Sequence, residues 1–86
     1  MEVAFKPAFL HQFKKLPLPL QEEVYEKLEL FKNPKNHPGL KVHKLKGALA
    51  GKHSFSVNYK YRIVFVWERQ QELAVLLAVG DHTVYD

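Results

Sequence analysis

Residues 53–79, HSFSVNYKYRIVFVWERQQELAVLLAV, contain three strand-like runs that decide the fold. Residues 53–59 alternate between apolar and polar side chains, as in a strand with one covered face. Residues 61–67 are densely apolar and β-branched, and residues 73–79 are apolar throughout, which favours a central strand covered on both faces. The alternation in the first run sends Phe55, Val57 and Tyr59 to one face and Ser54, Ser56 and Asn58 to the other.

The N-terminal third of the chain has the pattern of a short strand followed by two helices. Met1–Phe5 alternate like a strand, and Pro7–Leu16 begin with a proline, which suits the first turn of a helix. Pro17 and Pro19 are expected to stop this helix and start a second one, which Asn33-Pro34 ends and which has Glu22 and Glu23 in its first turn, beside the positive end of the helix dipole. Apolar residues repeat at helical spacing along both helices and are predicted to be core: Phe9, Leu10, Phe13, Leu16, Leu20, Val24, Leu28 and Phe31. The sequence therefore predicts an α+β fold, in which an N-terminal strand and two helices precede an antiparallel meander of three to four strands, with the helices on one face of the sheet.

Length and composition limit the class of protein. Residues 1–86 are expected to form a single domain, because 86 residues leave no room for a second core. The chain has no cysteine, so it has neither a disulfide nor a catalytic or metal-binding thiolate. No apolar run reaches the roughly 18 residues of a membrane span, and the first segment lacks the apolar core of a signal peptide. We therefore expect a cytoplasmic protein with no membrane partner.

The formal net charge is +4, and the basic residues are concentrated in one stretch. No acidic residue lies between Glu29 and Glu68. Eight of the thirteen lysines and arginines lie there: Lys32, Lys35, Lys41, Lys44, Lys46, Lys52, Lys60 and Arg62. A one-sided basic surface can bind a polyanion, because each neutralised phosphate releases counterions. The same charges also suit a solvated surface that keeps the protein soluble, and charge alone does not separate the two readings.

Several motifs are missing from the sequence. It contains no P-loop, no GxGxxG and no G-x-S-x-G, so nucleotide-cofactor binding and α/β-hydrolase chemistry have no support. His37 and His43 are six residues apart, with no cysteine and no HExxH helix, which is not the pattern of a metal site. We therefore expect neither a metal nor a cofactor.

Arg62, His82 and Tyr85 are the remaining candidates for chemistry. RNA is cut without a metal when a ribose 2′-OH attacks the adjacent phosphate, which requires a base, a cation for the developing charge and an acid for the leaving 5′-oxygen. Histidine transfers protons near neutral pH, arginine binds phosphate through two parallel hydrogen bonds, and tyrosine can stack on a base or donate a proton. The same three residues also fit a strand salt bridge, a solvated loop histidine and an aromatic residue that closes the core.

The segment LKVHKLKGALAGKHSFSVNYKYRIVFVW, residues 40–67, resembles the central block of the RelE/ParE superfamily of toxins from type II toxin–antitoxin systems. In that family a Leu-Lys-Gly turn leads to a glycine, a strand and a Tyr-Arg pair that opens the next strand. These features are matched here by Leu45-Lys46-Gly47, Gly51 and Tyr61-Arg62. The ending LLAVGDHTVYD is similar to the family's closing strand, whose glycine is followed by a basic residue or histidine and then by valine-tyrosine. With the order of elements, the resemblance covers the whole chain and implies a RelE-like microbial RNase fold.

This resemblance also implies a toxin that a cognate antitoxin holds inactive and, in the RelE branch, an endoribonuclease that cleaves mRNA on the ribosome and so inhibits translation. Arg62 matches the family's phosphate-contacting arginine, and His82 and Tyr85 match its other catalytic positions. The residues expected to bind RNA are Lys44, Lys46, Lys52, His53, Ser54, Ser56, Asn58 and Lys60. Serines stand at 54 and 56, in the strand that carries catalytic lysines in RelE. Two alternatives therefore stay open, a ParE-like inhibitor of DNA gyrase that cuts no RNA and an interaction module of the same fold that has lost toxicity.

Overall fold

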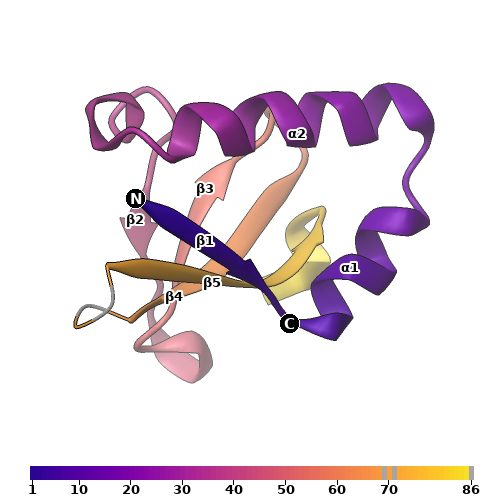
Figure 1. Cartoon of the computed structure of the whole chain (residues 1–86). Helices are drawn as coiled ribbons and strands as arrows, with labels where there is room; N and C mark the ends of the chain where they lie inside the picture. Colours follow the sequence, from indigo (N-terminus) through magenta and orange to yellow (C-terminus); the bar gives the residue numbers. More distant parts are fainter. Residues whose placement is uncertain (69, 71, 86) are drawn as a thin grey trace.

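The computed structural model describes residues 1–68, 70 and 72–85, without the side chains of Thr83 and Tyr85. Its helices and strands are β1 (Glu2–Phe5), α1 (Pro7–Lys14), α2 (Leu18–Phe31), β2 (His43–Lys44), β3 (His53–Ser56), β4 (Arg62–Glu68) and β5 (Leu73–Gly80). Short 3-10 helices lie between and after them: η1 (Pro34–Asn36), η2 (Gly47–Leu49) and η4 (His82–Tyr85). The predicted order of a strand, two helices and a meander is confirmed (Figure 1).

The strands form one sheet in the order β1-β5-β4-β3-β2. The steps from β2 to β5 are antiparallel, as the sequence predicts. β1, however, lies beside β5 and runs parallel to it, so the sheet is mixed; the sequence predicted the antiparallel meander but not this parallel pairing. In the sequence, the two helices lie between β1 and the meander. After three antiparallel steps β5 runs opposite to β2, and β1 lies at the edge of the sheet beside β5, in the same direction as β5 (Figure 1).

The core lies between the sheet and the two helices. Phe31 of α2 is fully buried, stacks on Phe55 with ring centroids 4.2 Å apart, and meets Phe65 edge to face at 4.9 Å. Burying a side chain of this size stabilises the fold by roughly 1.5–3 kcal/mol. Most of the predicted stripe is buried or half-buried, but Leu10 is 42% exposed, so its assignment to the core is wrong. Its neighbour Phe9 points into the core, and one step along a helix turns the side chain by about 100° towards solvent.

Both helices have a proline in their first turn, where a missing N–H costs no hydrogen bond. α2 begins at Leu18, between the two prolines that were predicted to start it, so Glu22 and Glu23 lie beyond its first turn and their predicted place there is wrong. The Gln21 side chain donates to the Leu16 carbonyl at 2.9 Å, which ties α2 to the turn that follows α1. α2 has 14 residues, and no helix in the described part of the chain is long and apolar enough to cross a membrane.

β3 ends at Ser56, before the predicted end at Tyr59. Asn58 causes the early end, because its Oδ1 accepts the backbone N–H groups of Lys60 at 2.9 Å and Tyr61 at 2.8 Å and so folds the chain into a turn. The turn removes Tyr59 from the strand and leaves it 93% exposed, so its predicted place on the covered face beside Phe55 is wrong.

Candidate nucleic-acid interface

The face of the sheet opposite the helices carries Arg62. The register pairs Ser56 with Arg62 and Arg62 with Gly80, and paired residues share one face of a sheet. Ser54 belongs to this face by alternation, but it is 0% exposed, so the predicted polar surface does not include it. Ser56, beside Arg62, is half-buried.

The segment after β5 folds back over this face of the sheet. The Val84 N–H donates to the Asp81 carbonyl at 3.0 Å, which closes the turn of η4. A Cβ atom built on Gly80 would lie 2.6 Å from Val84 Cγ1, so a side chain at this position would push η4 away. The glycine at the end of β5 therefore lets the C-terminal segment approach the start of β4.

This turn brings His82 and Arg62 to the same hollow, of about 270 Å³, which Tyr59 and Lys60 also line. The structure thus brings together two of the three predicted catalytic residues and one of the predicted RNA-binding lysines. Tyr85 ends η4, and its side chain lies outside the described part of the chain. The catalytic roles themselves stay predictions.

The Arg62 guanidinium is held by the turn that precedes it. Its Nη1 donates to the carbonyls of Asn58 and of Tyr61, the latter at 3.1 Å. The hydrogen bonds of this guanidinium to described residues both run through Nη1, and Nη2 and Nε are the parallel pair of donors that a guanidinium can offer to a phosphate. An arginine anchored at one nitrogen loses less rotamer freedom when an anion binds.

Asn58 fixes the turn. The sequence predicted a direct contact between Asn58 and RNA and did not predict this structural role. Besides its two Oδ1 acceptor bonds, its Nδ2 donates to Glu23 Oε1 of α2 at 2.6 Å. Its backbone carbonyl accepts from Arg62. The amide is therefore committed within the protein and positions Arg62 relative to the helix layer. An asparagine directly before a polar pair and a Tyr-Arg strand start is the sequence signal of such an Asx turn.

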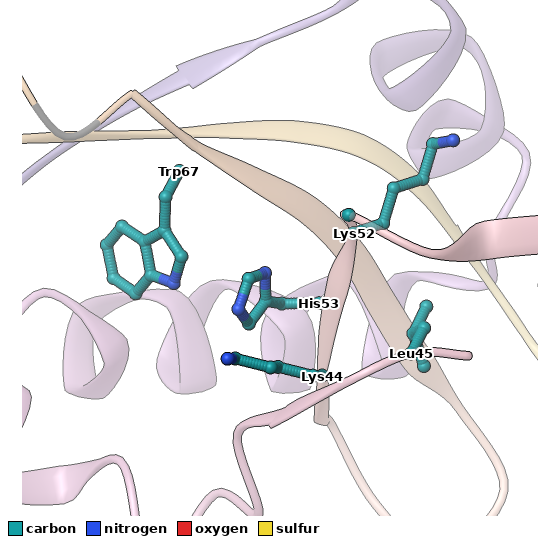
Figure 2. Close-up of a pocket in the computed structure, with 6 residues that line it drawn as sticks. Lys44, Leu45, Lys52, His53 and Trp67 are labelled. Atoms are coloured by element: carbon teal, nitrogen blue, oxygen red, sulfur yellow. The ribbon is translucent and has the colours of Figure 1, made fainter.

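The other predicted RNA-binding residues are divided between two places. Lys44, Lys52 and His53 line a second hollow together with Trp67 (Figure 2). Lys46 is exposed and lines none of the hollows described here. The stretch without acidic residues thus forms two separate cationic hollows, where the sequence predicted one basic face.

Few of the chain's lysines are neutralised by ion pairs. In the described part of the chain, salt bridges join Lys27 to Glu26 at 3.9 Å and Lys32 to Glu29 at 2.7 Å. The hydrogen bond that the Lys32 ammonium donates to the Glu29 carboxylate raises the pKa of Lys32 above its usual value. Both pairs involve α2 or its C-terminal end and neither includes a lysine of the two hollows, which therefore keep their positive charge for an outside anion. Among the described residues, no three histidine, aspartate or glutamate side chains gather closely enough to hold a metal ion.

No protein-family model matches this chain, and no curated protein matches its sequence. Solved structures do match its fold. The RelBE2 toxin–antitoxin complex of Mycobacterium tuberculosis superposes with a TM-score of 0.73 at 22% identity, over 94% of this chain and 96% of that one. The YoeB–YefM complex of Staphylococcus aureus gives a TM-score of 0.73 at 20% identity, over 95% and 97% of the two chains.

A YoeB/ParE toxin of Agrobacterium tumefaciens gives a TM-score of 0.70 at 18% identity, over 95% of this chain and 99% of that one. The chain therefore has the RelE/ParE-like toxin fold, over nearly its full length. At these identities the likeness establishes the fold, and the activity has to be argued from the site.

Proposed function

We propose that the protein is the toxin of a toxin–antitoxin pair and a metal-independent endoribonuclease that cleaves mRNA. The observation that carries the proposal is the hollow in which Arg62 and His82 lie together, on the face of the sheet opposite the helices. One side chain supplies a phosphate-binding fork and the other a proton-transfer group, which are the parts that cleavage through the ribose 2′-OH needs.

The proposed reaction forms one bond and breaks another at the same phosphorus. The 2′-oxygen loses its proton to a base and bonds to phosphorus, while the bond from phosphorus to the 5′-oxygen breaks and that oxygen takes up a proton. His82 is the proton-transfer group, with Tyr85 as its proposed partner. Arg62, through Nη2 and Nε, neutralises the charge that develops on the phosphoryl oxygens, and Lys60 adds a second cation to the same hollow.

The proposed partners are a cognate antitoxin, mRNA and the ribosome, all in the cytoplasm. The comparison structures of M. tuberculosis and S. aureus are toxin–antitoxin complexes by description. An apolar hollow between β1, α1 and α2 suits a partner segment, because it exposes Phe5, Leu10 and Tyr25 by 43%, 42% and 65%. An antitoxin segment with apolar anchors and acidic residues would fit both this surface and the chain's net charge of +4.

A second candidate function is inhibition of DNA gyrase without RNA cleavage. The buried Ser54 favours it, since this strand offers no exposed cation next to Ser56 and Arg62. In that case the Arg62 surface would bind protein, and inhibition would depend on the fold of the Asn58 turn more than on proton transfer.

One experiment separates the two candidates. Purified protein is incubated with mRNA, with and without ribosomes, and cleavage ends are mapped; a parallel reaction measures gyrase supercoiling. The proposal expects cleavage that Arg62→Ala abolishes and Lys14→Ala, an exposed lysine on α1, leaves unchanged. Gyrase inhibition with intact mRNA would replace the proposal with the second candidate.

A further inference from the structure

A hollow of about 350 Å³ lies at the β2–β3 edge of the sheet. It is lined by Lys44, Leu45, Gly51, Lys52, His53 and Trp67, and among the described residues no acidic side chain lines it. The hollow shares no lining residue with the one that holds Arg62 and His82. Its lining combines two lysines and a histidine with an indole ring.

The indole ring is fixed in place by the core. Trp67 stacks towards Phe31 at 6.1 Å, and Phe65 meets it edge to face at 5.2 Å and 87°. On the side of the hollow, the His53 ring lies 6.2 Å from the indole at 75°. Trp67 also lines the neighbouring hollow beside His37, so the indole forms the wall between two depressions. A ligand that stacks here does not have to order this side chain first.

The two lysines of this hollow lie on opposite sides of β3. The register pairs Lys44 with His53 and His53 with Phe65, so Lys44, His53 and Trp67 share a face. Figure 2 shows the Lys44 side chain extending on the same side of β3 as His53 and Trp67, while Lys52 points the other way. Lys44 is exposed, and no salt bridge joins Lys44 or Lys52 to a described residue. Both ammonium groups can therefore follow a flexible anion.

We propose that this hollow binds one nucleotide of a single RNA strand, with the base against Trp67 and the phosphate beside Lys44. An acidic peptide would use the lysines but has no group that needs a fixed aromatic wall, whereas a nucleotide uses both. That the strand is RNA rests on the proposed function. In this proposal the hollow contributes to RNA binding, and the cleavage reaction takes place at Arg62 and His82.

The two hollows lie on opposite faces of the sheet. His53 pairs with the core residue Phe65 on the helix face, while Ser56, three residues along β3, pairs with Arg62 on the other face. The two positions are about 10 Å apart along β3 at 3.3 Å per residue, so an RNA strand that reaches both hollows has to pass around the two-residue edge strand β2. An oligonucleotide that occupies both hollows binds more tightly than a mononucleotide, because the second contact is intramolecular.

Trp67 is the chain's single tryptophan, so its fluorescence reports this hollow directly. The titrants are a nucleoside monophosphate, inorganic phosphate, polyglutamate and a short 2′-O-methyl RNA, which lacks the attacking hydroxyl and cannot be cleaved. We expect saturable quenching by the monophosphate and the RNA, with the RNA binding more tightly. Phosphate should compete only weakly, because it has no base.

Two variants test the contacts. Lys44→Ala should weaken binding of labelled RNA by about tenfold, the usual scale of a hydrogen bond to a charged group, and lower its salt dependence. Trp67→Leu should weaken it by about tenfold and Trp67→Phe by less, since a phenyl ring still stacks. Lys14→Ala is the matched control. Circular dichroism checks each fold, and the exposed Lys44 gives a variant that does not disturb the core.

Unchanged binding in Lys44→Ala, absent quenching in the wild type, or tighter Lys44-dependent binding of polyglutamate than of RNA would each overturn the nucleotide site. Failure of the proposed function is a different result. A protein that binds the 2′-O-methyl RNA through Trp67 but leaves unmodified mRNA intact keeps this site and loses the nuclease.

Discussion

The two cationic hollows are built in opposite ways. At Arg62 the charge is held by backbone carbonyls of a turn, and that turn is tied to α2 through Asn58 and Glu23 at 2.6 Å. At Trp67 the aromatic ring is fixed by the core, and the lysines around it carry no ion pair with a described residue. Fixed donors suit a step in which charge develops at one place, whereas mobile cations and a flat ring suit binding of many sequences. This difference supports the proposal of the cleavage reaction at the first hollow and of nucleotide binding at the second.

The largest expected effect comes from His82, the proposed proton-transfer group of the first hollow. Glutamine keeps hydrogen bonding but does not titrate between about pH 5 and 8, so His82→Gln should slow cleavage by roughly 10²- to 10⁴-fold. Rates are measured across that pH range, with binding of the 2′-O-methyl RNA as the control. If His82→Gln cleaves RNA at the wild-type rate and with the wild-type pH profile, another group transfers the proton, and the contrast between the two hollows is weaker.

Arg62→Ala should lower the cleavage rate by about 10²- to 10³-fold, as the loss of one oxyanion donor does. Arg62→Lys should recover little, since an ammonium cannot form the parallel pair of bonds to phosphate. The Arg62 side chain also bonds to two turn carbonyls, so thermal unfolding accompanies the rate measurements. Full activity in a folded Arg62→Ala protein would remove this hollow as the reaction site.

Asn58 should act through position. Asn58→Asp keeps the turn acceptor but loses the donor to Glu23 and sets two carboxylates against each other. We expect about 1–3 kcal/mol of lost stability and a smaller loss of rate than at Arg62. Adding Glu23→Gln supplies an amide donor to the new carboxylate and should restore both. If the double variant recovers stability but not rate, Asn58 does more than hold the turn.

The smallest expected effect is on association with the antitoxin. Opposite charges speed the encounter, so the on-rate should fall as salt rises, while Leu10→Ser in the apolar hollow should mainly raise the off-rate. Stopped-flow mixing at several salt concentrations measures both. An on-rate that does not change with salt would contradict an electrostatic encounter.

The sequence predicted the elements well and their surroundings less well. Alternation along β3 places Ser54 and Ser56 on one face, but it does not reveal which segments cover that face, and Ser54 is fully buried. The parallel pairing of β1 with β5 was missed because strand period carries no direction. The proximity of Arg62 and His82 could be predicted from the sequence, because a glycine and a turn follow β5. Trp67 could not be assigned, since only the fold sets it beside Lys44 and His53.

The most direct test of the nuclease proposal is the chemistry of the cut ends. Purified protein is incubated with mRNA and ribosomes, in a buffer whose only divalent cation is the magnesium that keeps the ribosomes assembled. The products are resolved by mass spectrometry. Attack by the 2′-oxygen predicts 2′,3′-cyclic phosphate and 5′-hydroxyl ends, lost in Arg62→Ala and His82→Gln. Ends that carry 3′-hydroxyl and 5′-phosphate groups, or intact mRNA, would contradict it.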